Sequence, residues 1–438
     1  MYEIYASTDA VRLWEQWPAL SMEERVTQFT QLPREEADEF FQSLEPLEQA
    51  TLLLTLPRGE QRLWMRLLPP DDAADLIQEA PPEERERLVG LLDEVTRQEV
   101  RALLAHAEDD AGGLMNPRFA RIRPDMTVGE AVRYLRRQSA QVETIYYAYV
   151  LDGEQRLRGV VSFRQLFQAP EDAHVQDVMA TDLITVPQEM DQELVARLFA
   201  QHDLLALPVV NDAGRMVGII TFDDIADASR EEATEDIQKI GGVEALEEPY
   251  LRIGFARLLK KRAGWLSALF LGEMLTATAM AHFQQEMAAA IVLALFVPLI
   301  ISSGGNSGSQ ATTLVIRAMA LGEVRLRDWW RVLRRELGAG LGLGAILGVI
   351  GLVRILLWQA IGGVYGAHYL RIAETVSLSL VGVVLWGSVT GSMLPFALRK
   401  VGFDPASASA PLVATLVDVT GLIIYFTIAS FVLHGVLL

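Results

Sequence analysis

The pattern of hydrophobic and polar positions changes near residue 262. Beyond it lie five apolar stretches, each close to the ~20 residues that a membrane-spanning helix needs: about 264–283, 288–318, 338–361, 373–398 and 411–436. The second stretch contains the polar, glycine-rich sequence SSGGNSGSQ, residues 302–310. The pattern predicts a transmembrane domain over residues 263–438 with five helices, the second of them interrupted.

Residues 1–108 show a different pattern, in which short amphipathic runs alternate with prolines at positions 33, 46, 57, 70 and 82. A helix accepts proline in its first turn and otherwise ends before it. One short helix cannot bury its apolar face alone, so the pattern predicts an all-α N-terminal domain of stacked helical repeats. Ordinary helical packing without true repeats is the alternative.

Residues 115–228 contain an internal duplication. Each copy has Met, a short strand, Pro, a helix with an acidic start, an apolar strand, a turn, a glycine-containing strand and Ser or Thr before a second helix. This order resembles a tandem CBS-domain pair, an α/β module, here assigned to residues 109–228. Gly218, Thr221 and Asp224 match the family signature, whereas Gln165 stands where the first copy would have Asp. The resemblance implies ATP as a further ligand, at Tyr147, Ala148 and Arg164.

Charge fixes the expected orientation. Residues 229–262 are predicted to form an acidic connecting helix that runs into the basic sequence RLLKKR before the first span. Lys260, Lys261 and Arg262, five arginines between the second and third spans, and Arg399 with Lys400 all fall on one side. The positive-inside rule therefore places the N-terminal domains in the cytoplasm and the C-terminus outside the cell membrane. The N-terminal sequence has no signal-peptide pattern, which agrees with this topology.

Composition excludes several classes of protein. The chain has no cysteine, so disulfides and thiolate sites are absent. Residues 1–250 carry 49 acidic against 23 basic side chains, a net charge of −26, whereas residues 251–438 carry a net charge of +7. An acidic soluble half argues against nucleic-acid binding and suits cations, although solubility alone would also explain it. The histidines show no metalloprotease spacing and no nucleophile or phosphate-binding motif appears, so no enzyme is indicated.

Asp418 lies inside the fifth apolar stretch, where an ionised side chain is costly and usually faces a pathway or a partner. Pro411 opens this stretch, and irregular backbone is tolerated at membrane depth only where it is covered by protein or lines water. Asp418 and the glycine-rich segment together predict a cation-facing passage. Two alternatives are an ion pair between Asp418 and Arg354, and close helix packing by Gly304, Gly305 and Gly308.

The segments PLIISSGGNSGSQATTLVIRAMALGEV and PLVATLVDVTGLIIYFTIAS resemble the signature segments of the MgtE magnesium channels, and the domain order is similar too. The resemblance implies a homodimer that conducts Mg²⁺ inward and is closed by cytosolic Mg²⁺. It places the pore metal at Asp418 and the Ala414 carbonyl, and it differs at Ala410, where the family usually has Asn. The acids implied in gating are Asp191, Glu193, Asp203, Asp223, Asp224, Asp227, Glu232, Glu235, Asp236 and Asp404.

Two other functions remain open at this stage. A proton-coupled divalent-cation transporter would use Asp418 as its proton site, although the five spans show no inverted repeat. A membrane sensor of adenylates would use the CBS pair alone and would make Asp418 dispensable for cation flux. Flux measurements with several divalent ions would separate these functions.

Overall fold

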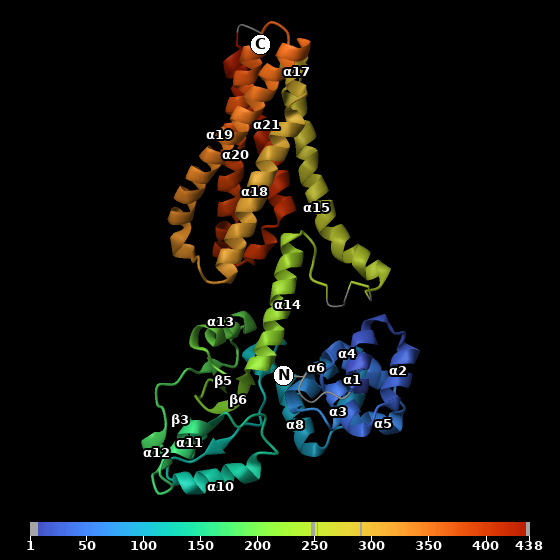
Figure 1. Ribbon diagram of the computed structural model, residues 1–438, viewed down its shortest axis with the longest axis vertical. Coiled ribbons are helices and arrows are strands. Elements are labelled where there is room, and N and C mark those ends of the chain that lie inside the picture. Colours follow the sequence, from blue (N-terminus) through green and yellow to red (C-terminus); the bar gives the residue numbers. More distant parts are fainter. Residues whose placement is uncertain (1–7, 247–249, 252, 290, 435–438) are drawn as a thin grey trace. The chain divides into compact units, whose positions relative to one another are not determined.

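The computed structural model describes residues 8–246, 250–251, 253–289 and 291–434. The chain forms two compact units, Met1–Arg230 and Glu231–Leu438, each treated by itself (Figure 1). Residues 1–7, which enter the signal-peptide argument, and residues 435–438, which end the predicted fifth span and the C-terminal tail, lie outside the described residues.

The first half of the first unit is helical, as the proline spacing predicts. Pro46, Pro70 and Pro82 lie in the first turn of their helices, and Pro33 and Pro57 lie directly before theirs. The rings of Phe29 and Phe41 pack against Trp64 in the core, with centroids 4.9 and 5.2 Å from it. The elements are α1 (Thr8–Gln16), η2 (Trp17–Ala19), α2 (Met22–Gln31), α3 (Arg34–Gln42), α4 (Pro46–Thr55), α5 (Arg58–Met65), α6 (Pro70–Glu79), α7 (Pro82–Val89), α8 (Glu94–Leu103) and α9 (Ala111–Leu114).

The duplication forms two three-stranded sheets of the same topology. In each, the first strand pairs in parallel with the second, and the second pairs antiparallel with the third. The predicted hairpin turns join the second and third strands in both copies. The first copy has β1 (Arg121–Ile122), α10 (Val128–Gln138), β2 (Tyr147–Leu151), β3 (Leu157–Ser162), α11 (Phe163–Gln168) and α12 (Val175–Val178); the second has β4 (Val186–Pro187), α13 (Gln192–His202), β5 (Ala206–Val210) and β6 (Met216–Thr221).

The predicted continuous connecting helix over 229–262 is wrong in two respects. Helix α14 (Phe222–Ile240) begins earlier, directly after β6, and ends before Gly241. Gly242 has a φ of +73°, which L side chains rarely adopt, and a Cβ there would lie 2.9 Å from the Trp265 ring and 3.2 Å from Pro411. A turn at Gly242 therefore replaces the helical link, and the basic sequence RLLKKR belongs to the following helix α15 (Phe255–His282).

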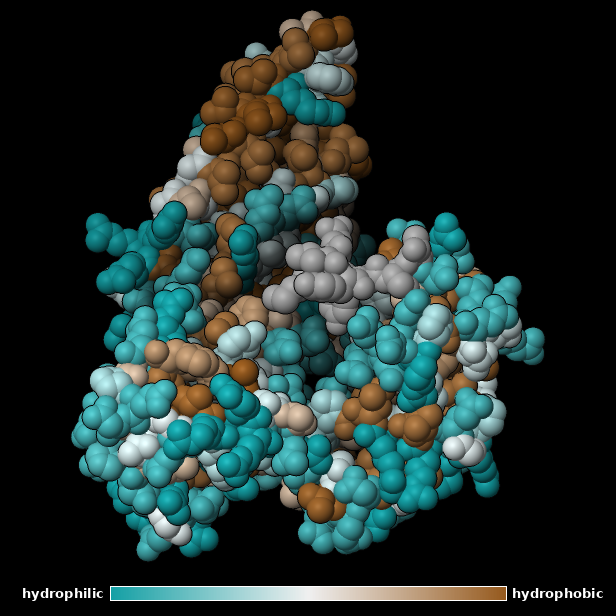
Figure 2. All heavy atoms as spheres, turned by 60° about the horizontal axis from the view of Figure 1, so that its bottom comes forward, coloured by the Kyte–Doolittle hydropathy of each residue, from teal (hydrophilic) through white to brown (hydrophobic). Residues whose placement is uncertain are grey.

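Among the described residues of the second unit, five helices are long and apolar enough to cross a membrane, as predicted. Hydrophobic side chains cover much of their surface, whereas hydrophilic side chains dominate the surface of the first unit (Figure 2). The elements that follow α15 are α16 (Gln284–Ala289), α17 (Ile291–Ala294), α18 (Val297–Ala320), η3 (Leu326–Asp328), α19 (Trp329–Gly362), α20 (Tyr369–Val401), η4 (Pro405–Ser407) and α21 (Ala410–Leu433).

The predicted break at SSGGNSGSQ is wrong, because α18 is helical throughout this segment. Its glycines allow close packing against α20: a Cβ on Gly391 would lie 2.1 Å from the Gly308 carbonyl oxygen, and one on Gly387 would lie 2.3 Å from that of Gly304. The small-residue alternative is therefore confirmed for Gly304 and Gly308. A turn at residues 295–296, between α17 and α18, lies earlier in the chain.

Pro395 is inside α20 and cannot donate the usual backbone hydrogen bond one turn back. The Thr312 hydroxyl of α18 donates to the Gly391 carbonyl at 2.8 Å instead. Thus the polar residues of the glycine-rich helix satisfy backbone groups of its neighbour. They stabilise a packed helix pair on which the candidate site is built.

Candidate cation site

Asp418 lies in the third turn of α21, a helix with a capped N-terminus. The Ser409 hydroxyl caps it by accepting a hydrogen bond from the Leu412 amide at 3.3 Å, and Pro411 occupies its first turn. Val413 and Val417 are fully buried and anchor one face of the helix. Asp418 lies on a neighbouring, half-buried face, one turn after Ala414.

The Asp418 carboxylate lies over Gly305 of α18. A Cβ built on Gly305 would lie 3.5 Å from both the Asp418 Oδ1 atom and the Ala414 Cβ. Gly305 therefore differs from Gly304 and Gly308, where a Cβ would lie 2.5 Å from the Val383 Cγ1 atom and 2.7 Å from the Val413 Cγ1 atom. The two segments that carried the sequence argument meet at this point, where α18 and α21 pack together (Figure 1).

The alternative ion pair between Asp418 and Arg354 is contradicted. The Arg354 guanidinium lies over the ring of Trp358, 4.6 Å from its centroid. This cation–π contact and snorkelling account for an arginine in α19 without a carboxylate partner. Within the described residues, Asp418 has neither an ion pair nor a hydrogen bond to its carboxylate.

Glu273 of α15 is a second acid inside a predicted span, and the sequence argument missed it. It is close enough to Asp418 for the two carboxylates to interact electrostatically. The signal was present in the sequence, since LGEML places one acid in the middle of the first apolar stretch.

In the first unit, an acidic cluster forms where α6 faces the start of α14. It contains Asp71 and Asp72 of α6, Asp223 and Asp224 of α14, and Glu143 before β2. The buried Asn116 amide donates to Asp71 at 3.0 Å and to Glu143 at 2.7 Å. Asp223 and Asp224 were predicted from the sequence, whereas Asp71, Asp72 and Glu143 were not, because they come from segments distant in sequence.

Burial and like charge both act on this acidic cluster. Desolvation, reinforced by Asp223 and other neighbouring acids, raises the pKa of Asp72 to about 6 and that of Glu143 to about 7. Desolvation also raises the pKa of Asp224 to about 7, although hydrogen bonds from Thr221 oppose it. The pKa of Asp71 is raised well above its usual range for the same reasons. The acidic cluster therefore favours a proton or a cation at neutral pH.

The other acids predicted for gating in the first unit have local partners. Asp191 caps α13 by accepting from the Glu193 amide at 2.9 Å, and Glu193 pairs with Arg197 at 2.5 Å. Asp203 ends α13 in the left-handed region with a φ of 51°. Asp227 pairs with Arg230 at 2.7 Å. These contacts explain the acids structurally and leave their role in gating as a prediction.

In the second unit, Lys239 joins two of the predicted gating acids. Its Nζ atom lies 2.5 Å from Glu235 of the same helix and 2.7 Å from Asp404, which precedes η4. Burial lowers the pKa of Lys239, but hydrogen bonds to Asp404 and Glu235 outweigh it, so the pKa is raised. Glu232 and Asp236 lie on the same helix α14.

The predicted nucleotide residues lie at one end of the first CBS sheet. Tyr147 opens β2 and pairs across the sheet with Ser162, and Arg164 follows in the first turn of α11. Gln165 replaces an acid here, and its side-chain oxygen accepts from the Ser162 amide at 2.8 Å and hydroxyl at 2.9 Å. This amide completes a capping box, so the substitution preserves the local fold.

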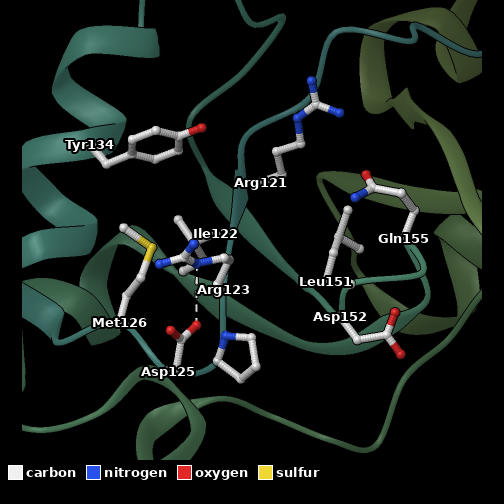
Figure 3. A pocket seen from close by; sticks show the side chains of 11 residues that line it. Arg121, Ile122, Arg123, Asp125, Met126, Tyr134, Leu151, Asp152 and Gln155 are labelled. Carbon is white, nitrogen blue, oxygen red and sulfur yellow. Dashed lines mark ion pairs between the residues drawn. The ribbon is translucent and has the colours of Figure 1, made fainter.

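An open pocket of about 630 Å³ lies at the opposite end of β2, where Leu151 and Asp152 line it. Figure 3 shows Arg121 and Tyr134 on its walls and the Arg123–Asp125 ion pair, 3.2 Å long, beneath them. Tyr147 is four residues from Leu151, roughly 13 Å along a strand. The pocket is thus distinct from the predicted nucleotide residues.

No group of three or more acidic or histidine side chains in the described ranges converges as it would on a directly bound metal ion. Mg²⁺ dehydrates reluctantly and is often held through its water molecules. Two carboxylates within a membrane that interact without a bound cation, such as Asp418 and Glu273, suit an ion that keeps its water shell.

Five apolar helices in the described residues, a half-buried acid where two helices pack together, and an acidic first unit indicate a multi-pass divalent-cation transporter. Residues 297–428 match the family described as a divalent cation transporter, residues 7–109 match the MgtE intracellular N domain, and residues 111–172 and 175–231 match CBS domains. The chain belongs to the MgtE family of magnesium transporters.

Two relatives and one solved structure illustrate the similarity. The magnesium transporter MgtE of Thermus thermophilus is 43% identical over 431 residues, 98% of this chain and 93% of the relative. That of Enterococcus faecalis is 34% identical, covering 76% of this chain and 71% of the relative. The crystal structure of the cytosolic domain of the Mg²⁺ channel MgtE in complex with ATP is 43% identical, covers 50% of this chain and 90% of that one, and has a TM-score of 0.48. The chain is a magnesium transporter, as the sequence resemblance predicts.

Proposed function

We propose that Mg²⁺ crosses the membrane along α21 and α18, past the carboxylate of Asp418 and the carbonyl of Ala414. The observation that carries this proposal is the position of Asp418 over Gly305, with no cation paired to it in the described residues. An acid at that depth needs a compensating charge, and a passing cation supplies it.

We further propose a homodimer in which the two copies of Asp418 face each other. Two carboxylates form a ring of charge −2, which a single divalent cation neutralises and a monovalent cation does not. In this arrangement the charge-bearing loops and the N-terminal domains lie in the cytoplasm and the C-terminus outside the cell. Ala410 stands at the entrance to α21, where the family usually has asparagine. The order of ion preference is therefore measured directly in the flux test below.

Cytosolic Mg²⁺ is proposed to close the channel by binding the acids of the cytosolic part. The acidic cluster of Asp71, Asp72, Glu143, Asp223 and Asp224 supports this, because its raised pKa values show that its ionised form is unfavourable without a bound cation. Asp191, Glu193, Asp203 and Asp227 of the first unit complete the proposed set with Glu232, Glu235, Asp236 and Asp404 of the second. Mg²⁺ acts as a switch only if it binds the closed state more tightly.

The test is ion flux into proteoliposomes that contain the full chain, with Mg²⁺, Mn²⁺, Co²⁺, Ca²⁺ and Na⁺ compared. Asp418→Ala should abolish divalent flux, and Asp418→Asn should keep a pore that no longer prefers divalent ions. Glu374→Gln removes an exposed acid that pairs with Arg371 near the start of α20 and is the matched control. Mg²⁺ flux through Asp418→Ala equal to that of the parent would contradict the pore assignment, and flux driven by a proton gradient alone would favour the proton-coupled alternative.

A second ligand, an adenine nucleotide, is proposed for Tyr147, Ala148 and Arg164. The favouring observation is that Arg164 is exposed and has no ion-pair partner in the described part of the chain, close to the open end of the sheet. A guanidinium in that position can bind phosphate. Calorimetric titration with ATP should show binding that Arg164→Ala weakens by about tenfold or more. Arg121→Ala, at the other end of the strands, should leave it unchanged.

A further inference from the structure

Glu273 lies in α15, where a charge requires an explanation. The helix runs from Phe255 to His282, and none of the residues in its most apolar 18-residue window is buried inside the protein. An ionised side chain on such a surface costs at least about 2.5–3.5 kcal/mol when it faces lipid. The residues beside it, Leu271, Met274 and Leu275, are exposed hydrophobic side chains.

Close packing of α15 against α21 brings Glu273 to the level of the candidate cation site. A Cβ on Gly272, the preceding residue, would lie 3.0 Å from the Thr415 methyl group. Thr415 is next to Ala414 and three residues before Asp418, so it belongs to the same turn as the proposed pore oxygens. Glu273 and Asp418 interact electrostatically across this contact.

The charge of this pair is not balanced by the protein. In the described ranges neither carboxylate forms an ion pair, and Arg354 of α19 is held on Trp358. Two neighbouring negative charges repel more strongly in a membrane than in water, because the effective dielectric constant is lower. A divalent cation between them would offset both charges, whereas a monovalent cation would leave one uncompensated.

We propose that Glu273 is a second carboxylate of the ion path, so that each subunit presents two acids, Asp418 and Glu273, to a hydrated Mg²⁺. This inference rests on the proposed function of Asp418 and extends it from one helix to two. Asp418 acts from α21 and Glu273 from α15, and both would bind through the water shell that Mg²⁺ retains. Glu273 thereby contributes to the preference for divalent over monovalent ions.

The experiment measures how Mg²⁺ blocks Na⁺ flux through the full chain in proteoliposomes. Glu273→Gln should raise the Mg²⁺ concentration for half-block by about tenfold, because one of two attracting charges is lost. Glu273→Asp keeps the charge and should stay close to the parent. Glu286→Gln, which removes an acid from α16, is the matched control and should have no effect. Elution volume and thermal unfolding midpoint verify that each variant is assembled.

The outcomes separate this inference from the function on which it rests. Suppose that Mg²⁺ blocks Na⁺ flux through Glu273→Gln as it does in the parent, while Asp418→Asn no longer discriminates between divalent and monovalent ions. That result would overturn the role of Glu273 and leave the pore assignment intact. If Asp418→Asn discriminates between divalent and monovalent ions as the parent does, both the pore assignment of Asp418 and the role of Glu273 are wrong. If Glu273→Asp is as impaired as Glu273→Gln, shape rather than charge matters and the inference is wrong. It is equally wrong if Glu273→Gln shifts only the pH dependence of flux, since the pair would then hold a proton.

Discussion

The contacts of Lys239 predict that this residue competes with Mg²⁺ for two of the proposed gating acids, Glu235 and Asp404. Its ammonium group lies between Glu235 and Asp404, at 2.5 and 2.7 Å, where a divalent cation could instead join the two carboxylates. Lys239→Gln removes the resident charge and leaves both acids in place. We expect the variant to bind Mg²⁺ more tightly at this position and to close at a lower Mg²⁺ concentration.

The structure also sets the size of the effect. A buried hydrogen bond to a charged group contributes about 1.5–3 kcal/mol. The three side chains are 30%, 34% and 39% exposed, so solvent screening reduces the two contacts together to about 1 kcal/mol. Loss of this competition in Lys239→Gln should therefore lower the Mg²⁺ concentration at half-maximal closure about fivefold.

The assay is limited proteolysis of the full chain in detergent against Mg²⁺ concentration, at constant ionic strength, paired with flux measurements. Lys400→Gln removes an exposed lysine from the end of α20 and controls for the loss of one positive charge. A midpoint that stays the same as the parent, or that moves to higher Mg²⁺, would refute the competition. A shift shared by Lys400→Gln would show that overall charge, rather than the contact, is responsible.

The remaining predictions concern pH, packing and backbone conformation. Because Asp72, Glu143 and Asp224 have pKa values raised to about 6, 7 and 7, the folded first unit binds more protons than the unfolded chain between pH 4 and 7. Its stability should therefore fall as pH rises through that range, by a few degrees in unfolding midpoint, and Mg²⁺ should restore it more at pH 7.5 than at pH 5.5; a midpoint independent of pH would contradict this. Gly391→Ala forces a Cβ to within 2.1 Å of the Gly308 carbonyl oxygen and should cost about 3 kcal/mol or more, whereas Gly342→Ala, with nothing within 4 Å, should be neutral or slightly stabilising when both unfolding midpoints are measured. Asp203→Ala and Asp203→Asn should alter the Mg²⁺ midpoint equally, but only Ala should lower stability, by about 1 kcal/mol, because the φ of 51° suits Asn and not Ala; equal unfolding midpoints would show that the backbone there is not strained.

Local signals made much of the fold predictable. Proline positions marked the helix starts of the first 108 residues because proline constrains the backbone of its own turn. The duplicated strands followed from alternating apolar runs and turn residues, and the spans from length and hydropathy alone. In each case the determining residues are neighbours in sequence.

The errors arose where tertiary packing decided the outcome. SSGGNSGSQ has the composition of a loop in water, yet it forms a regular helix that packs on α20 through its small residues and through the Ser307 hydroxyl. The end of α14 was missed because the turn at Gly242 is set by contacts to Trp265 and Pro411. Folding alone brings Asp224 together with Asp71, Asp72 and Glu143. Glu273 is a single acid in an apolar stretch of sequence, and its relation to Asp418 depends on the packing of α15 against α21.

The turn at Gly242 changes how a signal could reach the pore. Because α14 ends before Gly241, a pull along the first span is not the direct route. Gly242 instead lies beside Pro411, in the first turn of the proposed pore helix α21, where a Cβ on the glycine would come within 3.2 Å of the proline ring. The end of α14 also packs there through Ile240, beside Ala406 and Ala408. A displacement of the end of α14 would therefore move α21 by direct packing contact rather than through the backbone that leads into α15.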